Sequence, residues 1–311
     1  MLSNVLLASV SLAIASADAA PPMPLLVQDS SAKRIAIVQP DGSLLWERRI
    51  GPAHDFQVLP GGHVLMQDSW THLLEVDPRT DEVVWEYDAR DALSDDDRGG
   101  KLEVHAFQRL PGGCTMLALS GPSEIVEIEP DGRVAVRVPL RVDNSHPHHD
   151  TRLARKTDAG TYLVAHESDG AIREYDADGT VVWEYAVPLF GQERAGGHGL
   201  EAFGNQAFGV HRLPSGNTLV TTGNGHGLIE VTPSEEIVWR LSQDDLPGVR
   251  LAWTTSVEVL ADGTLLLTNC HAGPEQPQVV AVRRDKTVAW AFRDFDRFGN
   301  ALTNAAVYRA E

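Results

Sequence analysis

The chain has 311 residues, and its content of 42% hydrophobic and 23% charged residues is typical of a folded globular protein. Its 44 acidic residues outnumber its 26 lysines and arginines, which gives a formal net charge of -18 at pH 7. This excess of negative charge disfavours nucleic acid and anionic membrane surfaces, so neither is expected as a partner.

The first twenty residues have the pattern of a secretory signal. An apolar stretch from Val5 to Ala15 is followed by small residues that fit the cleavage site of a signal peptidase. This stretch is too short to span a bilayer comfortably, and no later stretch could span one. We therefore expect a signal peptide at residues 1–20, one domain at residues 21–311 without a membrane span, and a secreted or periplasmic protein.

Five segments of similar sequence follow one another along the chain. They cover residues 54–87, 105–138, 148–185, 208–241 and 255–292. Within each segment, four short runs of alternating apolar and polar residues are separated by turns, which is typical of antiparallel strands. The last run usually contains a tryptophan, and we expect these side chains to pack between neighbouring units (Trp85, Trp183, Trp239 and Trp290).

Two fragments flank these five units and complete a sixth. Residues 25–50 match the second, third and fourth strands, including a tryptophan at Trp46, and residues 302–311 match a lone first strand. The sequence therefore predicts an all-β fold, a six-bladed β-propeller of four-stranded antiparallel blades, whose ring is closed by pairing of the C-terminal strand with the N-terminal strands. Cys114 and Cys270 fall in different blades and on opposite faces, so we predict no disulfide.

Eleven of the twelve histidines map to one face of the predicted propeller. In an antiparallel blade, the segment that leads into the first strand and the loop between the second and third strands lie on the same face, and the first strand lines the channel. Histidines recur at such positions, and only His63 maps to the opposite face (His54, His72, His105, His146, His148, His149, His166, His198, His211, His226 and His271). The longest connections, 88–104 and 187–206, would wall a pocket there.

The repeats resemble those of the PQQ-like and arylsulfotransferase-type β-propeller proteins of bacteria, most of all in HHDTRLARKTDAGTYLV at residues 148–164. The similarity spans the six units. Bacterial arylsulfate sulfotransferases are periplasmic six-bladed propellers with a histidine nucleophile in the channel, and the resemblance implies that His149 takes this role while Arg152 binds the sulfate oxyanion. PQQ-dependent dehydrogenases share the tryptophan-ended strand but have eight blades, adjacent cysteines and a calcium site, so PQQ is disfavoured as a cofactor.

Two interpretations of the histidine-rich face are open. In the first, a pocket binds a small molecule such as an anion, a sugar or an aryl ester, through ligand-binding residues on several blades (His54, His105, His148, His166, Glu167, Glu201, Trp253 and His271). In the second, the protein is a histidine-dependent sulfuryl or acyl transferase or a hydrolase. His149 would attack or take a proton, Arg152 and His211 would stabilise charge, and Asp150 or Glu167 would orient an imidazole.

Two further alternatives use the same face. Four histidines around one axis, His54, His105, His148 and His211, are candidate ligands of a divalent metal in a lyase or an oxygenase. The propeller would otherwise serve as a scaffold for a protein partner, because a fold does not determine a function. The sequence leaves both the ligand and the cofactor open.

Overall fold

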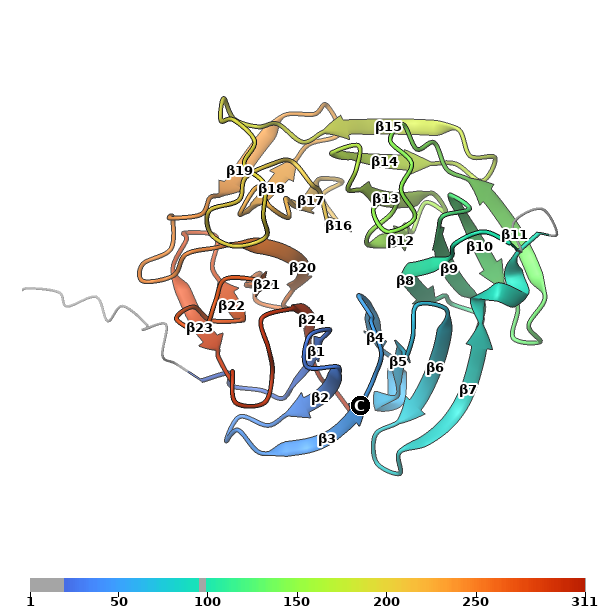
Figure 1. Cartoon of the computed structure of the whole chain (residues 1–311), viewed down its shortest axis with the longest axis horizontal. Coiled ribbons are helices and arrows are strands. Elements are labelled where there is room, and N and C mark those ends of the chain that lie inside the picture. Colours follow the sequence, from blue (N-terminus) through green and yellow to red (C-terminus); the bar gives the residue numbers. More distant parts are fainter. Residues whose placement is uncertain (1–19, 95–98, 311) are drawn as a thin grey trace, which may run out of the picture.

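Six four-stranded antiparallel sheets form a ring around a central channel in the computed structural model, which describes residues 20–94 and 99–310 (Figure 1). In five sheets the strands follow the order of the chain, and the sixth joins the two ends of the chain. The six-bladed propeller predicted from the repeats is confirmed. Residues 1–19 of the predicted signal peptide lie outside the described residues.

We number the blades along the chain. Blade 1 consists of β24 (Leu302–Val307), β1 (Leu25–Asp29), β2 (Arg34–Val38) and β3 (Leu44–Arg49). Blade 2 consists of β4 (Phe56–Val58), β5 (Val64–Gln67), β6 (His72–Asp77) and β7 (Glu82–Asp88). Blade 3 consists of β8 (Glu103–Arg109), β9 (Thr115–Ser120), β10 (Glu124–Ile128) and β11 (Val134–Pro139).

The remaining blades repeat this arrangement. Blade 4 consists of β12 (Ala154–Lys156), β13 (Tyr162–His166), β14 (Ala171–Tyr175) and β15 (Val181–Ala186). Blade 5 consists of β16 (Gly209–Arg212), β17 (Thr218–Thr221), β18 (Leu228–Val231) and β19 (Ile237–Leu241). Blade 6 consists of β20 (Trp253–Val259), β21 (Leu265–Cys270), β22 (Val279–Val282) and β23 (Val288–Phe292).

Two short 3-10 helices, η1 (Pro60–Gly62) and η2 (Ala89–Ala92), complete the elements. Within the described ranges, no helix has the length and apolar character needed to cross a membrane. The repeated turn glycines have a backbone reason, since Gly160 and Gly263 adopt φ values of +84° and +82°, which side chains with a Cβ atom rarely adopt.

The two ends of the chain close the ring within blade 1. Strand β24 pairs antiparallel with β1, with Leu25 opposite Val307 and Val27 opposite Ala305. This pairing gives blade 1 its innermost strand, as the sequence predicted. All six blades then have four strands, and β1 is paired on both of its edges, with β24 and with β2.

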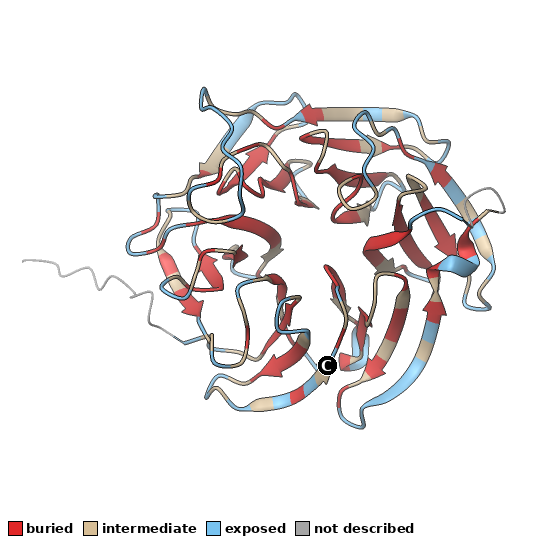
Figure 2. Cartoon of the chain, viewed as in Figure 1, coloured by how far each residue is buried: buried red, intermediate tan, exposed pale blue. Residues whose placement is uncertain are grey.

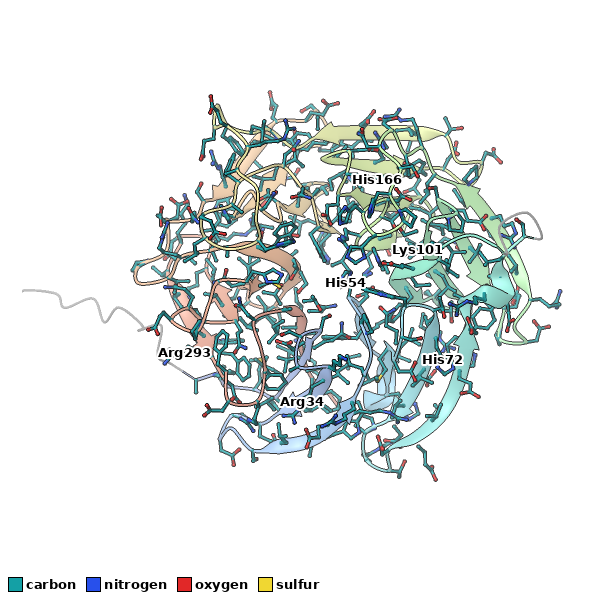
Figure 3. The ribbon with its side chains drawn as sticks, viewed as in Figure 1. Arg34, His54, His72, Lys101, His166 and Arg293 are labelled. Atoms are coloured by element: carbon teal, nitrogen blue, oxygen red, sulfur yellow. The ribbon has the colours of Figure 1, made fainter. Side chains whose placement is uncertain are left out.

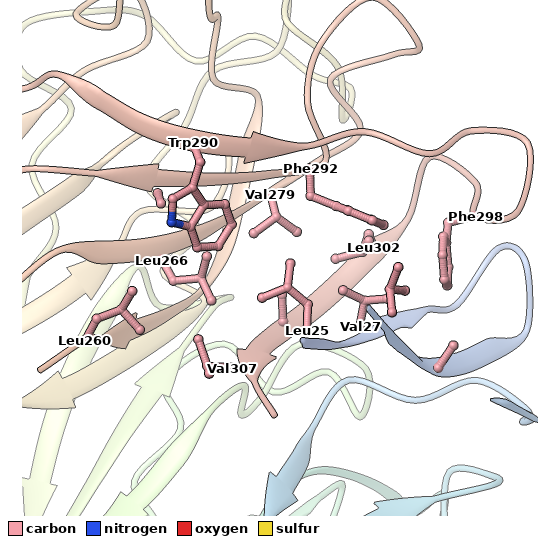
Figure 4. Close-up of a cluster of buried hydrophobic side chains, with 14 residues drawn as sticks. Leu25, Val27, Leu260, Leu266, Val279, Trp290, Phe292, Phe298, Leu302 and Val307 are labelled. Atoms are coloured by element: carbon pink, nitrogen blue, oxygen red, sulfur yellow. The ribbon is translucent and has the colours of Figure 1, made fainter. Parts of the chain in front are cut away.

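The core lies between the blades. Each pair of neighbouring blades encloses a cluster of buried apolar side chains, and Figure 4 shows the cluster between blades 6 and 1, which includes Leu25, Leu266 and Trp290. The inner strands are buried almost throughout, whereas exposed residues collect on the outermost strands and the turns (Figure 2). The rigid inner ring therefore supports the segments that begin at the channel.

Tryptophans of the outermost strands bond to the next blade, as predicted. Nε1 of Trp46 donates to Asp81 Oδ1 at 2.9 Å, and Nε1 of Trp239 donates to the carbonyl oxygen of Arg284 at 2.9 Å. Each acceptor lies in the outer hairpin of the following blade. Cys114 and Cys270 are both free, and they lie in blades 3 and 6.

Candidate functional site at the mouth of the channel

A cavity of about 170 Å³ lies where segments of five blades converge on the channel. Its lining contains four histidines of the blades, one of the long connection 187–206, and an arginine–glutamate pair (His54, His148, His149, Arg152, Glu167, His198, Phe208, Trp253, Thr255, Cys270, His271 and Thr303). Figure 3 shows His54 at the channel and His72 toward the rim of its blade. A larger hollow of about 560 Å³ lies at the rim beside residues 291–297, but no histidine lines it.

Glu103, His105 and His148 form a compact group behind this cavity. One ligand atom of each residue lies within 4.8 Å of those of the other two. Oε2 of Glu103 lies 3.0 Å from Nε2 of His105 and 2.5 Å from Nδ1 of His148. The other carboxylate oxygen pairs with Nζ of Lys101 at 2.8 Å. Glu103 and His105 are buried, and the His148 side chain is about one third exposed.

The local backbone explains how these side chains meet. Glu103 and His105 are alternate residues at the start of β8, and alternate residues of a strand point to the same side. The pairing of β8 with β9 shifts register between Val104 and Ala106, which marks a bulge at His105. Bulges of this kind re-aim side chains and are frequent beside functional sites.

A tight turn presents His148 from blade 4. The amides of His149 and Asp150 both donate to the carbonyl oxygen of His146, at 2.7 and 2.9 Å. The buried Asp150 carboxylate accepts from the amide of His146 and, at 3.3 Å, from the amide of Gly121 in blade 3. The Asp150 side chain therefore fixes the turn and does not orient an imidazole.

Arg152 is the buried cation of the cavity, with 4% of its surface exposed. Its Nε donates to the Glu167 carboxylate, its Nη1 lies 3.0 Å from Nδ1 of His54, and its guanidinium lies over the Phe208 ring. Arginine can only donate, so Nδ1 of His54 is the acceptor and the ring proton is assigned to Nε2. Among the residues that the structure describes, none bonds to Nη2 of Arg152.

A second layer of polar side chains holds Glu167. Its Oε1 accepts a hydrogen bond from Nε2 of Gln206 at 2.9 Å, and Gln206 is held in turn by two hydrogen bonds with Asn224. Nε2 of His149 lies 4.0 Å from the same Oε1. Glu167 is thus buried, fully bonded and positioned between Arg152 and His149.

A group of stacked rings forms another part of the cavity lining. The His198 ring stacks on Trp253 with centroids 5.0 Å apart and an angle of 26° between planes, and His271 lies 5.1 Å from His198. His198 belongs to the long connection 187–206, which therefore does contribute to the wall. Stacked rings of this kind form a flat apolar surface beside the polar groups of Arg152.

Burial favours the uncharged form of three imidazoles that line the cavity, His54, His149 and His271. Burial, followed by the charge of Arg152, holds the pKa of His54 well below 6.5 and lowers the pKa of His105 to about 4. Burial also lowers the pKa values of His149 and His271. A neutral imidazole offers one N–H and one lone pair, so these rings can donate, accept, take a proton or bind a metal at pH 7.

Most of the side chains that the sequence singled out lie together. Seven of the predicted residues line the cavity (His54, His148, His149, Arg152, Glu167, Trp253 and His271). His105 lies directly behind them, with its ring centroid 4.9 Å from that of His54 and 5.3 Å from that of His148. Imidazoles from blades 2, 3 and 4 therefore gather at one mouth of the channel.

The structure places three predicted residues elsewhere. His166 is fully buried inside blade 4, where Nδ1 donates to the carbonyl oxygen of Asp150 and Nε2 faces the Tyr175 hydroxyl. Glu201 is exposed and does not line the cavity. His211 lies in β16, outside the lining, so it belongs neither with His149 as a catalytic partner nor with the metal-ligand group.

Sequence reasoning missed Glu103, Trp70 and Phe208. Glu103 stands two residues before His105, in the predicted connection 88–104, and this spacing is the one signal that pointed to it. Trp70 lies in the loop between β5 and β6, and its ring packs edge-on against His54 at 4.9 Å. Phe208 lies just before β16 and contacts both His54 and Arg152. Trp70 carries no pattern that distinguishes it from core, whereas Phe208 stands eight residues before the turn glycine of its unit, as His54, His105 and Arg152 do.

No protein-family model and no curated protein matches the chain. Among solved structures, a protein of unknown function from Bacteroides caccae is 22% identical, with a TM-score of 0.76 over 93% of this chain and 100% of that chain. Virginiamycin B lyase from Staphylococcus aureus, solved with quinupristin as a catalytically inactive histidine-to-alanine variant, is 13% identical, with a TM-score of 0.56 over 87% and 84%. The WD40 propeller domain of Doa1 is 13% identical, with a TM-score of 0.55 over 89% and 77%.

These similarities establish the fold and not the activity, because all are below 25% identity. The chain is a six-bladed β-propeller with a histidine-rich cavity at one mouth of its channel. The resemblance to PQQ-like and arylsulfotransferase-type repeats stays a prediction.

Proposed function

We propose that the cavity binds a small ligand that carries an oxyanion group, such as a carboxylate or a sulfate. The observation that carries this proposal is the bonding of Arg152. Glu167 and His54 occupy Nε and Nη1, while Nη2 has no partner among the described residues. A guanidinium that is fixed on one side and free on the other is suited to recognise an oxyanion.

His54 supplies a second donor to the same ligand. Because Nδ1 of His54 accepts from Arg152, its proton is assigned to Nε2, and the ring lines the cavity. The stacked rings of His198 and Trp253 line the same cavity as these donors. Together they favour a ligand with an oxyanion at one end and a flat or apolar group at the other.

His149 supports a second candidate function, sulfuryl or acyl transfer. Its ring lines the cavity, burial lowers its pKa so that it keeps a lone pair at pH 7, and Glu167 lies 4.0 Å from Nε2. In such a reaction a His149 nitrogen would form a bond to the sulfur of an aryl sulfate while the aryloxide leaves, and Arg152 would stabilise the charge on the oxygens.

Binding is tested by calorimetry and tryptophan fluorescence with sulfate, phosphate, benzoate and 4-nitrophenyl sulfate. The R152M/E167Q variant removes the guanidinium without leaving a buried carboxylate charge, and we expect it to weaken binding at least about tenfold, as for the loss of a charged hydrogen bond. R155M/D55N is the matched control, because Arg155 pairs with the buried Asp55 in the same channel at 2.7 and 2.8 Å, neither residue lines the cavity, and the double substitution also leaves no buried carboxylate charge. Equal binding by wild type and R152M/E167Q would refute the proposal.

The variant His149→Ala distinguishes ligand binding from catalysis. With 4-nitrophenyl sulfate as donor and a phenol as acceptor, His149→Ala should abolish release of 4-nitrophenolate while sulfate still binds. Turnover that is equal in wild type and H149A would remove the transferase candidate and leave the binding function intact.

The signal-like pattern of residues 1–20 supports a location outside the cytoplasm for this binding function. Intact-mass measurement on the protein exported by a bacterial host would test it, since removal of about twenty residues is expected. A full-length mass in the exported fraction would contradict this location signal.

A further inference from the structure

We propose that Glu103, His105 and His148 bind a divalent transition-metal ion of the zinc type behind the channel-mouth cavity. Two imidazoles and one carboxylate are a ligand set typical of Zn²⁺, whereas Ca²⁺ and Mg²⁺ prefer shells of oxygen atoms. One ligand atom of each residue lies within 4.8 Å of the others. The proposal does not rest on oxyanion binding, because it is argued from the ligand atoms of these three side chains and not from Nη2 of Arg152.

The hydrogen bonds of His105 point to a cation. Its Nδ1 lies 2.7 Å from the carbonyl oxygen of Thr151, which can only accept, so a singly protonated ring carries its proton there. Nη1 of Arg152 is 3.2 Å from the same Nδ1 but is itself a donor, and it has the nearer acceptor in His54. Nε2 of His105 therefore presents its lone pair.

This lone pair faces a carboxylate. Nε2 of His105 and Oε2 of Glu103 are 3.0 Å apart in a buried environment, where two electron-rich atoms repel each other. A cation bound to both atoms turns this repulsion into attraction. A histidine whose other ring nitrogen donates to a backbone carbonyl is also the common arrangement at metal sites, because the outer hydrogen bond fixes the tautomer.

The two distances from Glu103 Oε2 to the histidine nitrogens come near those of a tetrahedral ion after a small movement, and the two histidine nitrogens lie within 4.8 Å of each other. Atoms that lie 2.0–2.1 Å from a tetrahedral ion are about 3.3 Å from one another. The distance between His105 Nε2 and Glu103 Oε2 is close to this value, whereas Nδ1 of His148 at 2.5 Å from Oε2 must move outward by about 0.8 Å. The His148 side chain is 32% exposed, so it has room to do so.

The surrounding groups hold the carboxylate in place. Lys101 Nζ binds the second oxygen of Glu103 at 2.8 Å and leaves Oε2 for the two histidines. His54 is not a fourth ligand through Nδ1, because that atom accepts from Arg152. Three protein ligands leave one coordination position for water or substrate, and His148 itself lines the cavity.

The test uses the untagged full-length protein after removal of metals with EDTA. Zn²⁺ is titrated by calorimetry, and Co²⁺ by its visible absorption, which is intense only in a tetrahedral site. We expect one ion per chain. Loss of an outer partner alone weakens metal sites 10–100-fold, so Glu103→Gln and His148→Ala should each weaken Zn²⁺ binding by about 100-fold or more.

His63→Asn is the matched control. His63 also bonds a carboxylate, with Nδ1 2.8 Å from Oε1 of Glu75, but on the opposite face of the propeller, and its loss should leave the Zn²⁺ affinity unchanged. If E103Q fails to fold, the test relies on the Zn²⁺ affinity of H148A, because His148 is partly exposed. Absence of Zn²⁺ binding to the wild type, or equal binding by wild type and H148A, would overturn the proposal.

Discussion

His166 should make the stability of the propeller fall as the pH drops below neutrality. Its ring is fully buried in blade 4, and burial lowers its pKa from 6.5 to about 4. Between these two values the unfolded chain binds a proton that the folded chain does not, so the free energy of unfolding decreases as the pH decreases. A difference of about 2.5 pKa units corresponds to about 3 kcal/mol, all of it present above pH 6.5 and lost by about pH 4.

The variant His166→Asn isolates this contribution. The amide nitrogen of asparagine can still donate to the carbonyl oxygen of Asp150, which accepts from Nδ1 of His166 at 2.7 Å. Urea unfolding is measured for both proteins from above pH 7 down to about pH 4, and the other buried histidines cancel in the difference. We expect the stability advantage of wild type over H166N to be constant above pH 7 and to shrink by about 3 kcal/mol toward pH 4. A difference that stays constant over the whole range would refute the reasoning.

Two further predictions concern ion pairs and blade packing. Arg173 is 1% exposed and bonded to Asp169, Asp143 and Glu184, so Arg173→Met should lower the free energy of unfolding by about 3–5 kcal/mol. Partial recovery of stability in R173M/D169N would show that the unpaired carboxylate is the cause. A loss below about 1 kcal/mol in R173M would contradict the prediction. Trp239→Phe removes the hydrogen bond to the Arg284 carbonyl oxygen and should lower the free energy of unfolding by about 1 kcal/mol more than Trp85→Phe does. The indole nitrogen of Trp85 has no such partner among the described residues. Equal losses of stability in denaturant unfolding would contradict a role for this hydrogen bond.

The fold was predictable because the sequence repeats the same structural unit. Five units with the same order of turns and strands leave few alternatives, and the fragments at 25–50 and 302–311 match complementary parts of a sixth unit. The same antiparallel logic placed the segments before the first strands at the channel. This placement required only the order of the strands and turns, and the turn glycines show where each turn lies.

The composition of the site was only partly predictable, because its side chains meet through details that repetition does not encode. Register shifts occur in the first strands of blades 1, 3 and 6, and the shift in blade 3 falls at His105, which contacts Glu103. His211 stands three residues further into its repeat than His54 does, at the position of Gln57, and its side chain lies outside the cavity. A repeat fixes which strand a residue belongs to, and the local register then decides where its side chain points.

Arg152 places a fixed positive charge between the two proposed sites. Its Nη1 lies 3.2 Å from Nδ1 of His105, whose other nitrogen faces Glu103. A metal ion bound to that nitrogen would be repelled by the charge of Arg152, because the two charges are separated by buried protein of low dielectric constant, where screening is weak. An oxyanion on Arg152 would offset the repulsion, and the coupling between two binding equilibria is reciprocal. We therefore expect sulfate to bind the zinc-loaded protein more tightly than the metal-free protein.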